Sequence, residues 1–272
     1  MGTEVWPGPL GEVRGVGAST GVSLTTTLAL TPLPKGTRYL TLMARNFAGG
    51  GVIARFALNP FLVVVRTGDA GVNLSDVSEV VQNAEDAGTL DMSSFPTLAN
   101  GGALYIGAHQ QFSGVRVDGT AFNGTASTLT VEHWNGSRWV DLSATDGSAA
   151  AGATFGQDGN VTWTMPGAGV WNPGALHKIL NPTGRTPHGD VPLYWTRWTV
   201  SAAFDTATTV ANLLALNRST TYAGIVNVET EPVKFSVQWG INGIGCVEAL
   251  TDAGTANLVI NAATRSDGSR FT

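Results

Sequence analysis

The sequence predicts an all-β protein: a β-sandwich or jelly-roll-like arrangement of antiparallel strands, with an extended N-terminal arm and one or two short helices. Three observations predict this class. The 272 residues include 35 glycines and 12 prolines spread along the chain, which interrupts long helices. Apolar and polar residues alternate with a period of two in several short stretches. These stretches recur at short intervals between turn signals, which is typical of sandwiches and barrels.

The first hundred residues divide into an arm, a strand region and an acidic stretch. Residues 1–36 are rich in Gly, Pro and Thr with little alternation, so we expect them to form the extended arm. Residues 37–100 begin with strand-like runs at 38–47 and 51–67 and continue as an acidic linker. In this linker the run "LSDVSEVVQNAEDA" predicts one short helix, because its apolar residues fall at helical spacing. These residues are Leu74, Val77, Val80 and Val81.

The most regular alternation lies in residues 101–205, and we expect this segment to be the core β-sandwich module. In the run "LYWTRWTVSAAF", Tyr194 and Trp198 share one face of a strand, while Trp195 and Arg197 share the other. A strand with aromatic residues on both faces is central in its sheet or covered by a neighbour.

The C-terminal segment, residues 206–272, contains further strand-like runs such as "AGIVNVET" and "VKFSVQWGI". We expect these strands to pack on those of residues 37–66. The run "TTVANLLAL" (208–216) predicts a second short helix. No repeat of fixed period is present, which argues against a solenoid or a propeller.

The composition limits the classes of partner. Charged residues make up 13% of the chain, against roughly 25% in typical soluble domains. A neutral polar surface of this kind suits extensive contacts with other protein surfaces. The formal net charge of −5 and the lack of a Lys/Arg cluster argue against nucleic acid. The N-terminus lacks the features of a secretory leader and no apolar run suits a membrane helix, so we expect synthesis in a reducing cytosol and no membrane partner.

The residues that carry metal or nucleophilic chemistry form no recognisable pattern. The histidines have neither helical zinc spacing nor a neighbouring carboxylate motif; they are His109, His133, His177 and His188. No phosphate-binding loop, dinucleotide fingerprint or nucleophile elbow occurs. The single cysteine, Cys246, follows an apolar stretch and is interpreted as a small buried apolar residue. We therefore predict no cofactor and no metal.

Several aspartates lie in turn sequences. Asp146 and Asp158 each precede a glycine, and Asp91 and Asp141 lie in similar polar stretches. Two carboxylates across a cleft can hydrolyse a glycoside, and Asp-rich loops can bind calcium. The alternating acidic pattern of a calcium loop is missing, so we interpret these side chains as turn acceptors and predict no catalytic residue.

The eight tryptophans raise the question of a ligand platform. Trp163 and Trp198 alternate with apolar neighbours, which predicts core positions. Trp134 and Trp139 flank "NGSR", which predicts a hairpin with an aromatic cross-strand pair. Three residues lie in stretches without such regular patterns and remain candidates for exposed contact or ligand residues. They are Trp171, Trp195 and Arg197.

The hairpin series resembles a pattern found in virion structural proteins of tailed bacteriophages. A strand ends in "WNGSRW" and is followed by "TDG", then by "GNVTWTMP" and finally by "LYWTR". The likeness covers about 100 residues, in the segments 104–118, 129–149, 155–171 and 192–204. The segment "NPGALHKILNPTGRTPHGD" before the last strand is longer than in the pattern. The motifs do not tell where on the virion the module lies.

The resemblance implies a non-enzymatic virion component, made in the host cytoplasm. We expect a capsid decoration or cement protein that binds the major capsid protein and copies of itself, as a homotrimer at three-fold positions. The arm, residues 1–36, is the candidate segment that orders on a neighbouring subunit. The alternatives are a tail, baseplate or fibre component, a carbohydrate-binding or receptor-binding module that uses exposed tryptophans, and a glycosidase or lyase that uses paired carboxylates.

Overall fold

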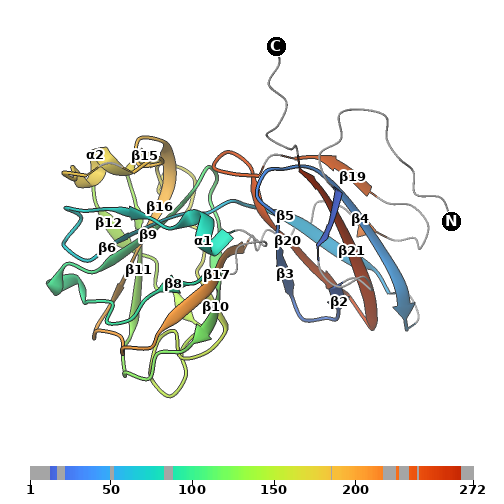
Figure 1. Ribbon diagram of the computed structural model, residues 1–272, viewed down its shortest axis with the longest axis horizontal. Helices are drawn as coiled ribbons and strands as arrows, with labels where there is room; N and C mark the ends of the chain where they lie inside the picture. Colours follow the sequence, from blue (N-terminus) through green and yellow to red (C-terminus); the bar gives the residue numbers. More distant parts are fainter. Residues whose placement is uncertain are drawn as a thin grey trace, which may run out of the picture.

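The computed structural model describes residues 13–16, 22–49, 52–82, 88–184, 186–216, 225–226, 233–237 and 239–264. Strands account for 48% of the chain and helices for 6%, so the all-β prediction is confirmed. Over these residues the α-helices are α1 (Ser78–Gln82) and α2 (Leu176–Leu180), with a 3₁₀ turn at Leu98–Asn100. No helix in this part of the chain is long and apolar enough to cross a bilayer. The strands form two β-sandwiches side by side (Figure 1).

The smaller sandwich pairs a five-stranded sheet with a four-stranded sheet. The first runs in the order β1 (Val13–Val16), β21 (Thr255–Thr264), β4 (Thr37–Ala48) and β19 (Val233–Ser236), with β2 (Val22–Leu24) also on β21. The second runs in the order β18 (Ile225–Val226), β5 (Ala54–Pro60), β20 (Ile244–Thr251) and β3 (Ala29–Pro32). Fully buried aliphatic and aromatic residues fill the space between them, among them Leu40, Leu42, Phe56, Val247 and Ile260.

The larger sandwich pairs a seven-stranded sheet with a five-stranded sheet. The first runs in the order β12 (Trp139–Asp141), β11 (Leu129–Trp134), β16 (Pro192–Val200), β9 (Ala103–Ala108), β6 (Val63–Thr67) and β7 (Ser75–Asp76), with β15 (Gly174–Ala175) also on β16. The second runs in the order β13 (Thr145–Asp146), β14 (Gly159–Thr162), β10 (Gly114–Ala121), β17 (Thr209–Leu216) and β8 (Leu90–Asp91). Ring contacts among large aromatic residues hold this core, including Phe112, Phe155, Trp163, Trp171 and Trp198.

The larger sandwich is inserted into the smaller one. The chain leaves the smaller sandwich after β5, builds β6 to β17, and returns at β18. The C-terminal strands β20 and β21 then pair with β5 and β4, so strands from the two ends of the sequence complete one sandwich. This order differs from the expected division, because residues 37–100 belong to both sandwiches and residues 206–216 belong to the larger one.

The structure also shows paired strands within the segment that was expected to form an extended arm. Within residues 22–36, strand β2 pairs with β21 and strand β3 pairs with β20. Leu24 and Leu33 are fully buried in the core of the smaller sandwich. These strands are only three and four residues long, so the sequence shows too few alternations to reveal them. Residues 1–12 and 17–21 of the predicted arm lie outside the described residues.

Of the two predicted helices, one is confirmed and the other is wrong. Helix α1 lies within the run 74–87, whereas "TTVANLLAL" forms strand β17. β17 lies between β10 and β8, and its last four residues are all buried. Because both faces of the strand are covered at this end, the apolar residues do not alternate, and a short apolar run of this kind cannot be distinguished from a helix by its period.

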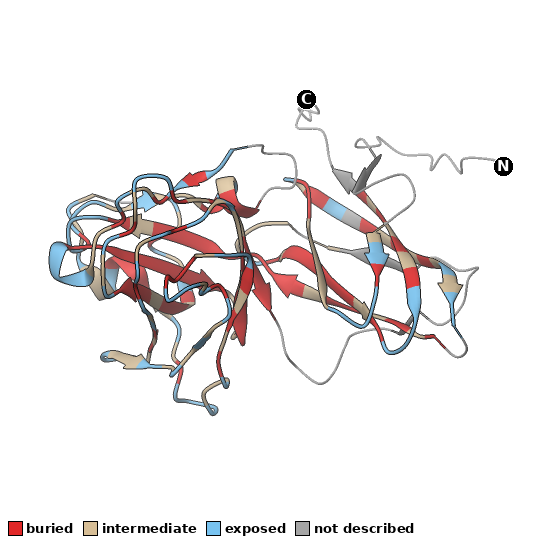
Figure 2. Cartoon of the chain, turned by 90° about the horizontal axis from the view of Figure 1, so that it is seen from below, coloured by how far each residue is buried: buried red, intermediate tan, exposed pale blue. Residues whose placement is uncertain are grey.

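The two sandwiches meet at a junction where β17 contacts β5 and β20. Figure 2 shows buried strand segments where the two sandwiches meet. Asn59 Nδ2 donates to the carbonyl of Ala215 at 2.7 Å and to Glu248 Oε2 at 2.6 Å. From the larger sandwich, Gln82 Oε1 accepts from the Leu62 N–H. Glu248 is 1% exposed, so its only polar surroundings are protein groups, and the junction has a fixed hydrogen-bonding pattern.

Candidate functional site

The structure shows that Trp171 and Trp195 are buried, so the prediction that these two side chains are exposed is wrong. They are 1% and 0% exposed. Trp171 Nε1 donates to the Trp195 carbonyl at 3.2 Å, and Trp195 Nε1 donates to the Gly174 carbonyl at 2.8 Å. The segment that contains β15 and α2 covers the outer face of the seven-stranded sheet, where Leu176 packs with Trp195. Indoles with satisfied N–H groups in such places stabilise the sheet.

The Arg197 side chain interacts with residues of its own sheet. Its Nε and Nη2 atoms lie 2.7 and 2.6 Å from Glu132 Oε2, and its guanidinium lies 5.3 Å from the centre of the Trp139 ring. The two charged side chains are only 20% and 17% exposed. The Arg197 guanidinium therefore holds together cross-strand neighbours on β11, β16 and β12. Little of this group is left to contact a ligand.

The hairpin prediction for the other tryptophan pair is confirmed. Trp134 and Trp139 are cross-strand partners, with ring centres 5.4 Å apart in an edge-to-face arrangement. Asn135 Oδ1 accepts hydrogen bonds from the backbone N–H groups of Ser137 and Arg138, which closes the turn. Both rings pack against the outer face of the seven-stranded sheet. This pair fixes the register of the hairpin.

The core positions of Trp163 and Trp198 are also confirmed. They are 7% and 1% exposed and lie with their rings 6.3 Å apart, edge to face. Trp163 Nε1 donates to the Phe112 carbonyl, and Trp198 Nε1 donates to Thr196 Oγ1. The period-2 phasing of their neighbours correctly assigned both side chains to the interior.

The turn interpretation is confirmed for three of the four aspartates. The carboxylates of Asp91, Asp141 and Asp146 each accept a hydrogen bond from the N–H two residues further on, at 2.7 to 2.9 Å. Asp158 Oδ1 instead accepts from the Gly119 N–H at 2.8 Å and so links the loop before β14 to strand β10. Among the described residues, no group of three or more His, Cys, Asp or Glu side chains is placed to hold a metal ion.

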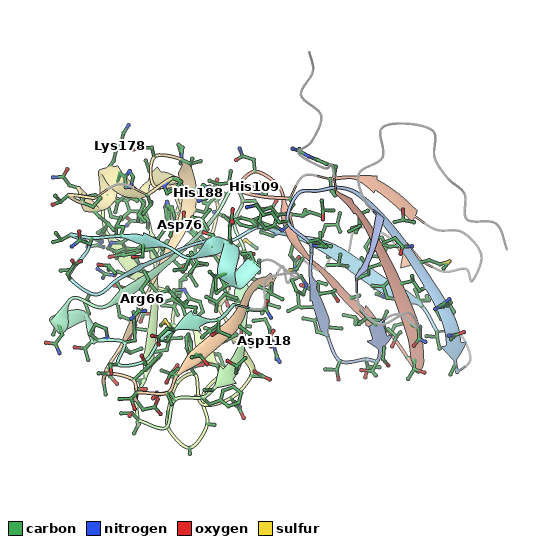
Figure 3. All side chains as sticks on the ribbon, viewed as in Figure 1. Arg66, Asp76, His109, Asp118, Lys178 and His188 are labelled. Atoms are coloured by element: carbon green, nitrogen blue, oxygen red, sulfur yellow. The ribbon has the colours of Figure 1, made fainter. Side chains whose placement is uncertain are left out.

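Two of the four histidines anchor the loop that follows α2. His177 Nε2 accepts from the Thr186 N–H at 3.0 Å, and its Nδ1 lies 3.2 Å from Asp190. His188 Nδ1 lies 2.5 Å from Asp76, which precedes α1 (Figure 3). These contacts hold the loop against the edge of the sheet, and they account for both side chains as structural groups.

His109 lines an open groove of about 560 Å³ in the larger sandwich. Strand β9 ends at Ala108, opposite Tyr194 at the start of β16, and this pairing places His109 beside Tyr194. The third wall is the loop 167–173. The polar and aromatic lining consists of His109, Gln110, Gln111, Trp171, Asn172 and Tyr194.

The groove has two electrostatic features. None of the described residues that line it is Asp, Glu, Lys or Arg. Burial lowers the pKa of His109 from its ordinary value, so its imidazole is neutral at neutral pH. Nδ1 of this ring is shielded from solvent and has no hydrogen-bond partner within the described chain. The groove therefore offers neutral hydrogen-bonding groups beside an aromatic wall.

Sequence reasoning did not find this groove, because its three segments are separate in the chain and none carries a motif. Trp171 was the only residue of its lining that was singled out as a ligand residue, and it forms the base of the groove with a buried ring. The run "HQQ" at 109–111 was the available signal, since three polar side chains interrupt an otherwise apolar β-region. Comparisons of the chain with protein-family models, with curated proteins and with solved structures find no match.

Proposed function

We propose that this chain is a non-enzymatic structural protein of a tailed-bacteriophage virion, in particular a capsid decoration or cement protein that binds and stabilises the shell of the major capsid protein. The observation that carries the proposal is the clustering of the virion-like motifs. All four segments that resemble the phage pattern contribute to the larger sandwich, as β9 to β14 and β16. The pattern thus corresponds to one folded module and not to scattered short matches.

The surface and the architecture support an assembly role. Only 13% of residues are charged, and small polar residues dominate instead, which lowers the cost of covering large areas of the protein with neighbouring subunits. The hydrogen-bonded junction holds two sandwiches together, so one chain can contact two neighbouring capsid subunits as a stiff clamp. We propose a homotrimer as the assembled unit, which matches three-fold positions of a shell.

Copy number and location in the particle test the proposal. Virions of the phage that encodes the chain are purified, and the copy number is measured against the major capsid protein by quantitative mass spectrometry. A decoration protein gives on the order of hundreds of copies, in register with the capsid symmetry, whereas a tail or baseplate component gives about three, six or twelve. Hundreds of copies together with density on the shell support the proposal. A low copy number with tail density, or absence from the particle, contradicts it.

Stabilisation is tested separately with purified components. Shells that lack the chain are incubated with the purified protein, and their rupture on heating is followed by light scattering. A cement protein raises the rupture temperature in a saturable way. Size-exclusion chromatography with light scattering then gives the oligomeric state, for which we expect three copies. Bound protein that leaves the rupture temperature unchanged contradicts the cement role.

A further inference from the structure

The open groove beside His109 carries an inference that is independent of the virion role, because it rests on the groove alone. We propose that it is a binding site for a neutral saccharide. Its volume of about 560 Å³ lies within the range of roughly 300–1,000 Å³ that small-molecule sites occupy. Since the groove is open to solvent, it suits one or two rings of a longer chain and not an enclosed small molecule.

The hydrogen-bonding groups of the groove match hydroxyl groups. Gln110, Gln111 and Asn172 each carry a carboxamide, which offers two donors and an acceptor. Gln111 Nε2 donates to the Trp171 carbonyl at 3.3 Å. Asn172 Nδ2 donates to the Asn135 carbonyl at 2.6 Å and to the Gly169 carbonyl at 3.4 Å, so Asn172 offers a ligand its carbonyl oxygen only. These bonds orient the amides and leave further capacity for a ligand. Vicinal hydroxyl groups, which both donate and accept, are complementary to such a set.

The lack of charge in the lining selects against ionic ligands. A phosphate, a carboxylate or an ammonium group in the groove would lose water without meeting an opposite charge among the described lining residues. The shielded Nδ1 atom of His109 also lacks a partner within the described chain, although buried polar atoms are nearly always paired.

The walls of the groove are held in place before any ligand binds. Tyr194 is partly buried and meets Trp171 edge to face, with ring centres 6.0 Å apart. Behind the loop, the Asn172 N–H donates to the Trp134 carbonyl at 3.1 Å and Trp171 Nε1 donates to the Trp195 carbonyl. A fixed aromatic wall beside oriented amides lowers the ordering cost of binding, and the C–H face of a pyranose ring packs on such a wall.

Saturation-transfer NMR on the purified full-length chain tests the site. The probes are maltotriose, triacetylchitotriose, mannotriose and galactobiose, with the capped neutral peptide acetyl-Gly-Ala-Gly-Ala-amide as a ligand of another class. The variants Gln110→Ala and His109→Ala change partly exposed groove residues. Gln157→Ala, at an exposed position in the loop between β13 and β14, is the matched control. Circular dichroism establishes that each variant is folded.

We expect saturation transfer to at least one of the saccharides. Loss of the Gln110 amide should weaken the Kd for that saccharide about tenfold, whereas Gln157→Ala leaves it unchanged. Three results overturn the proposal: no transfer to any saccharide, transfer that both groove variants leave intact, and transfer to the peptide alone. If Gln110→Ala does not fold, the His109→Ala variant decides between these outcomes.

Discussion

The side-chain amide of Asn59, in the smaller sandwich, donates a hydrogen bond of 2.7 Å to the backbone carbonyl of Ala215, in the larger one. The same amide donates to Glu248 Oε2 at 2.6 Å, and all of these groups are buried. Asn59 lies at the end of β5, where the chain passes from the smaller sandwich to β6 of the larger one. One carboxamide thus connects the edge of an inserted unit to the sheet of its host.

Asn59→Ala should therefore lower the free energy of unfolding by about 2–4 kcal/mol, because it leaves the buried Glu248 carboxyl and the Ala215 carbonyl without this donor. Urea unfolding, followed by tryptophan fluorescence and by circular dichroism, measures the change. Asn100→Ala, at an exposed position, is the control and should change stability by no more than about 0.5 kcal/mol. Equal stability of the two variants would show that the junction amide is dispensable.

Cys246 should be unreactive in the folded protein. It is 1% exposed, and burial raises the pKa of its thiol far above the usual range, with the nearby Glu248 carboxyl acting in the same direction. Iodoacetamide at pH 8 should leave the native chain unmodified for hours and alkylate it within minutes in strong denaturant. Mass spectrometry reads the result. Rapid alkylation under native conditions would mean that the junction opens readily.

Sequence patterns predicted the features of this fold that depend on local geometry. The alternation around Trp163 and Trp198 follows from the pleat of a strand, and both residues lie in the core as expected. The turn around Asn135 and the turn roles of the aspartates also depend on neighbouring residues only. The all-β class follows from the same short-range signals.

The errors concern burial that distant segments provide. Trp195 looked available because its own strand places it opposite the core, but the segment with α2 covers that face. The strand β17 was taken for a helix because partners remote in sequence bury both of its faces. The groove at His109 escaped prediction for the same reason, since it is assembled from three segments whose residues carry no motif.

Ala151→Gly should stabilise the protein. Ala151 is exposed and has a φ of 50°, a left-handed conformation that disfavours a residue with a Cβ atom. Glycine removes a strain of about 1–2 kcal/mol and costs roughly 0.5–1 kcal/mol of chain entropy, so a net gain of up to about 1 kcal/mol is expected. Thermal unfolding measures it. Ala149→Gly, in the same loop without a positive φ, should lower the Tm; a fall in both variants would contradict the strain argument.

His133 should make the folded state sensitive to mild acid. It is 3% exposed, and burial lowers its pKa, an effect that the nearby Val140 and Val170 backbones oppose only in part. Below the ordinary value of 6.5 the unfolded chain therefore binds more protons at this site than the folded chain, so stability falls as the pH falls. His109 acts in the same direction, since burial also lowers its pKa.

The slope of unfolding free energy between pH 7 and pH 5.5 measures this effect. His133→Gln should make the slope shallower, whatever its effect on overall stability, and His133→Gln combined with His109→Ala should make it shallower still. A slope that is the same in wild type and His133→Gln would contradict the assignment of this acid sensitivity to His133.

Gly107→Ala should destabilise the seven-stranded sheet where Gly107 packs against the Trp195 ring. A Cβ atom on Gly107 would lie 2.6 Å from the indole, which is held in place by its hydrogen bond to the Gly174 carbonyl and by the packed Leu176 side chain. Such overpacking should cost about 1–3 kcal/mol and shift the tryptophan fluorescence. Gly167→Ala is the control, because a Cβ atom there meets nothing within 4 Å. Chemical denaturation gives the free energy of unfolding of both variants. A Gly107→Ala protein as stable as the control would mean that the Trp195 ring can move aside. A ligand role for Trp195 would then be open again.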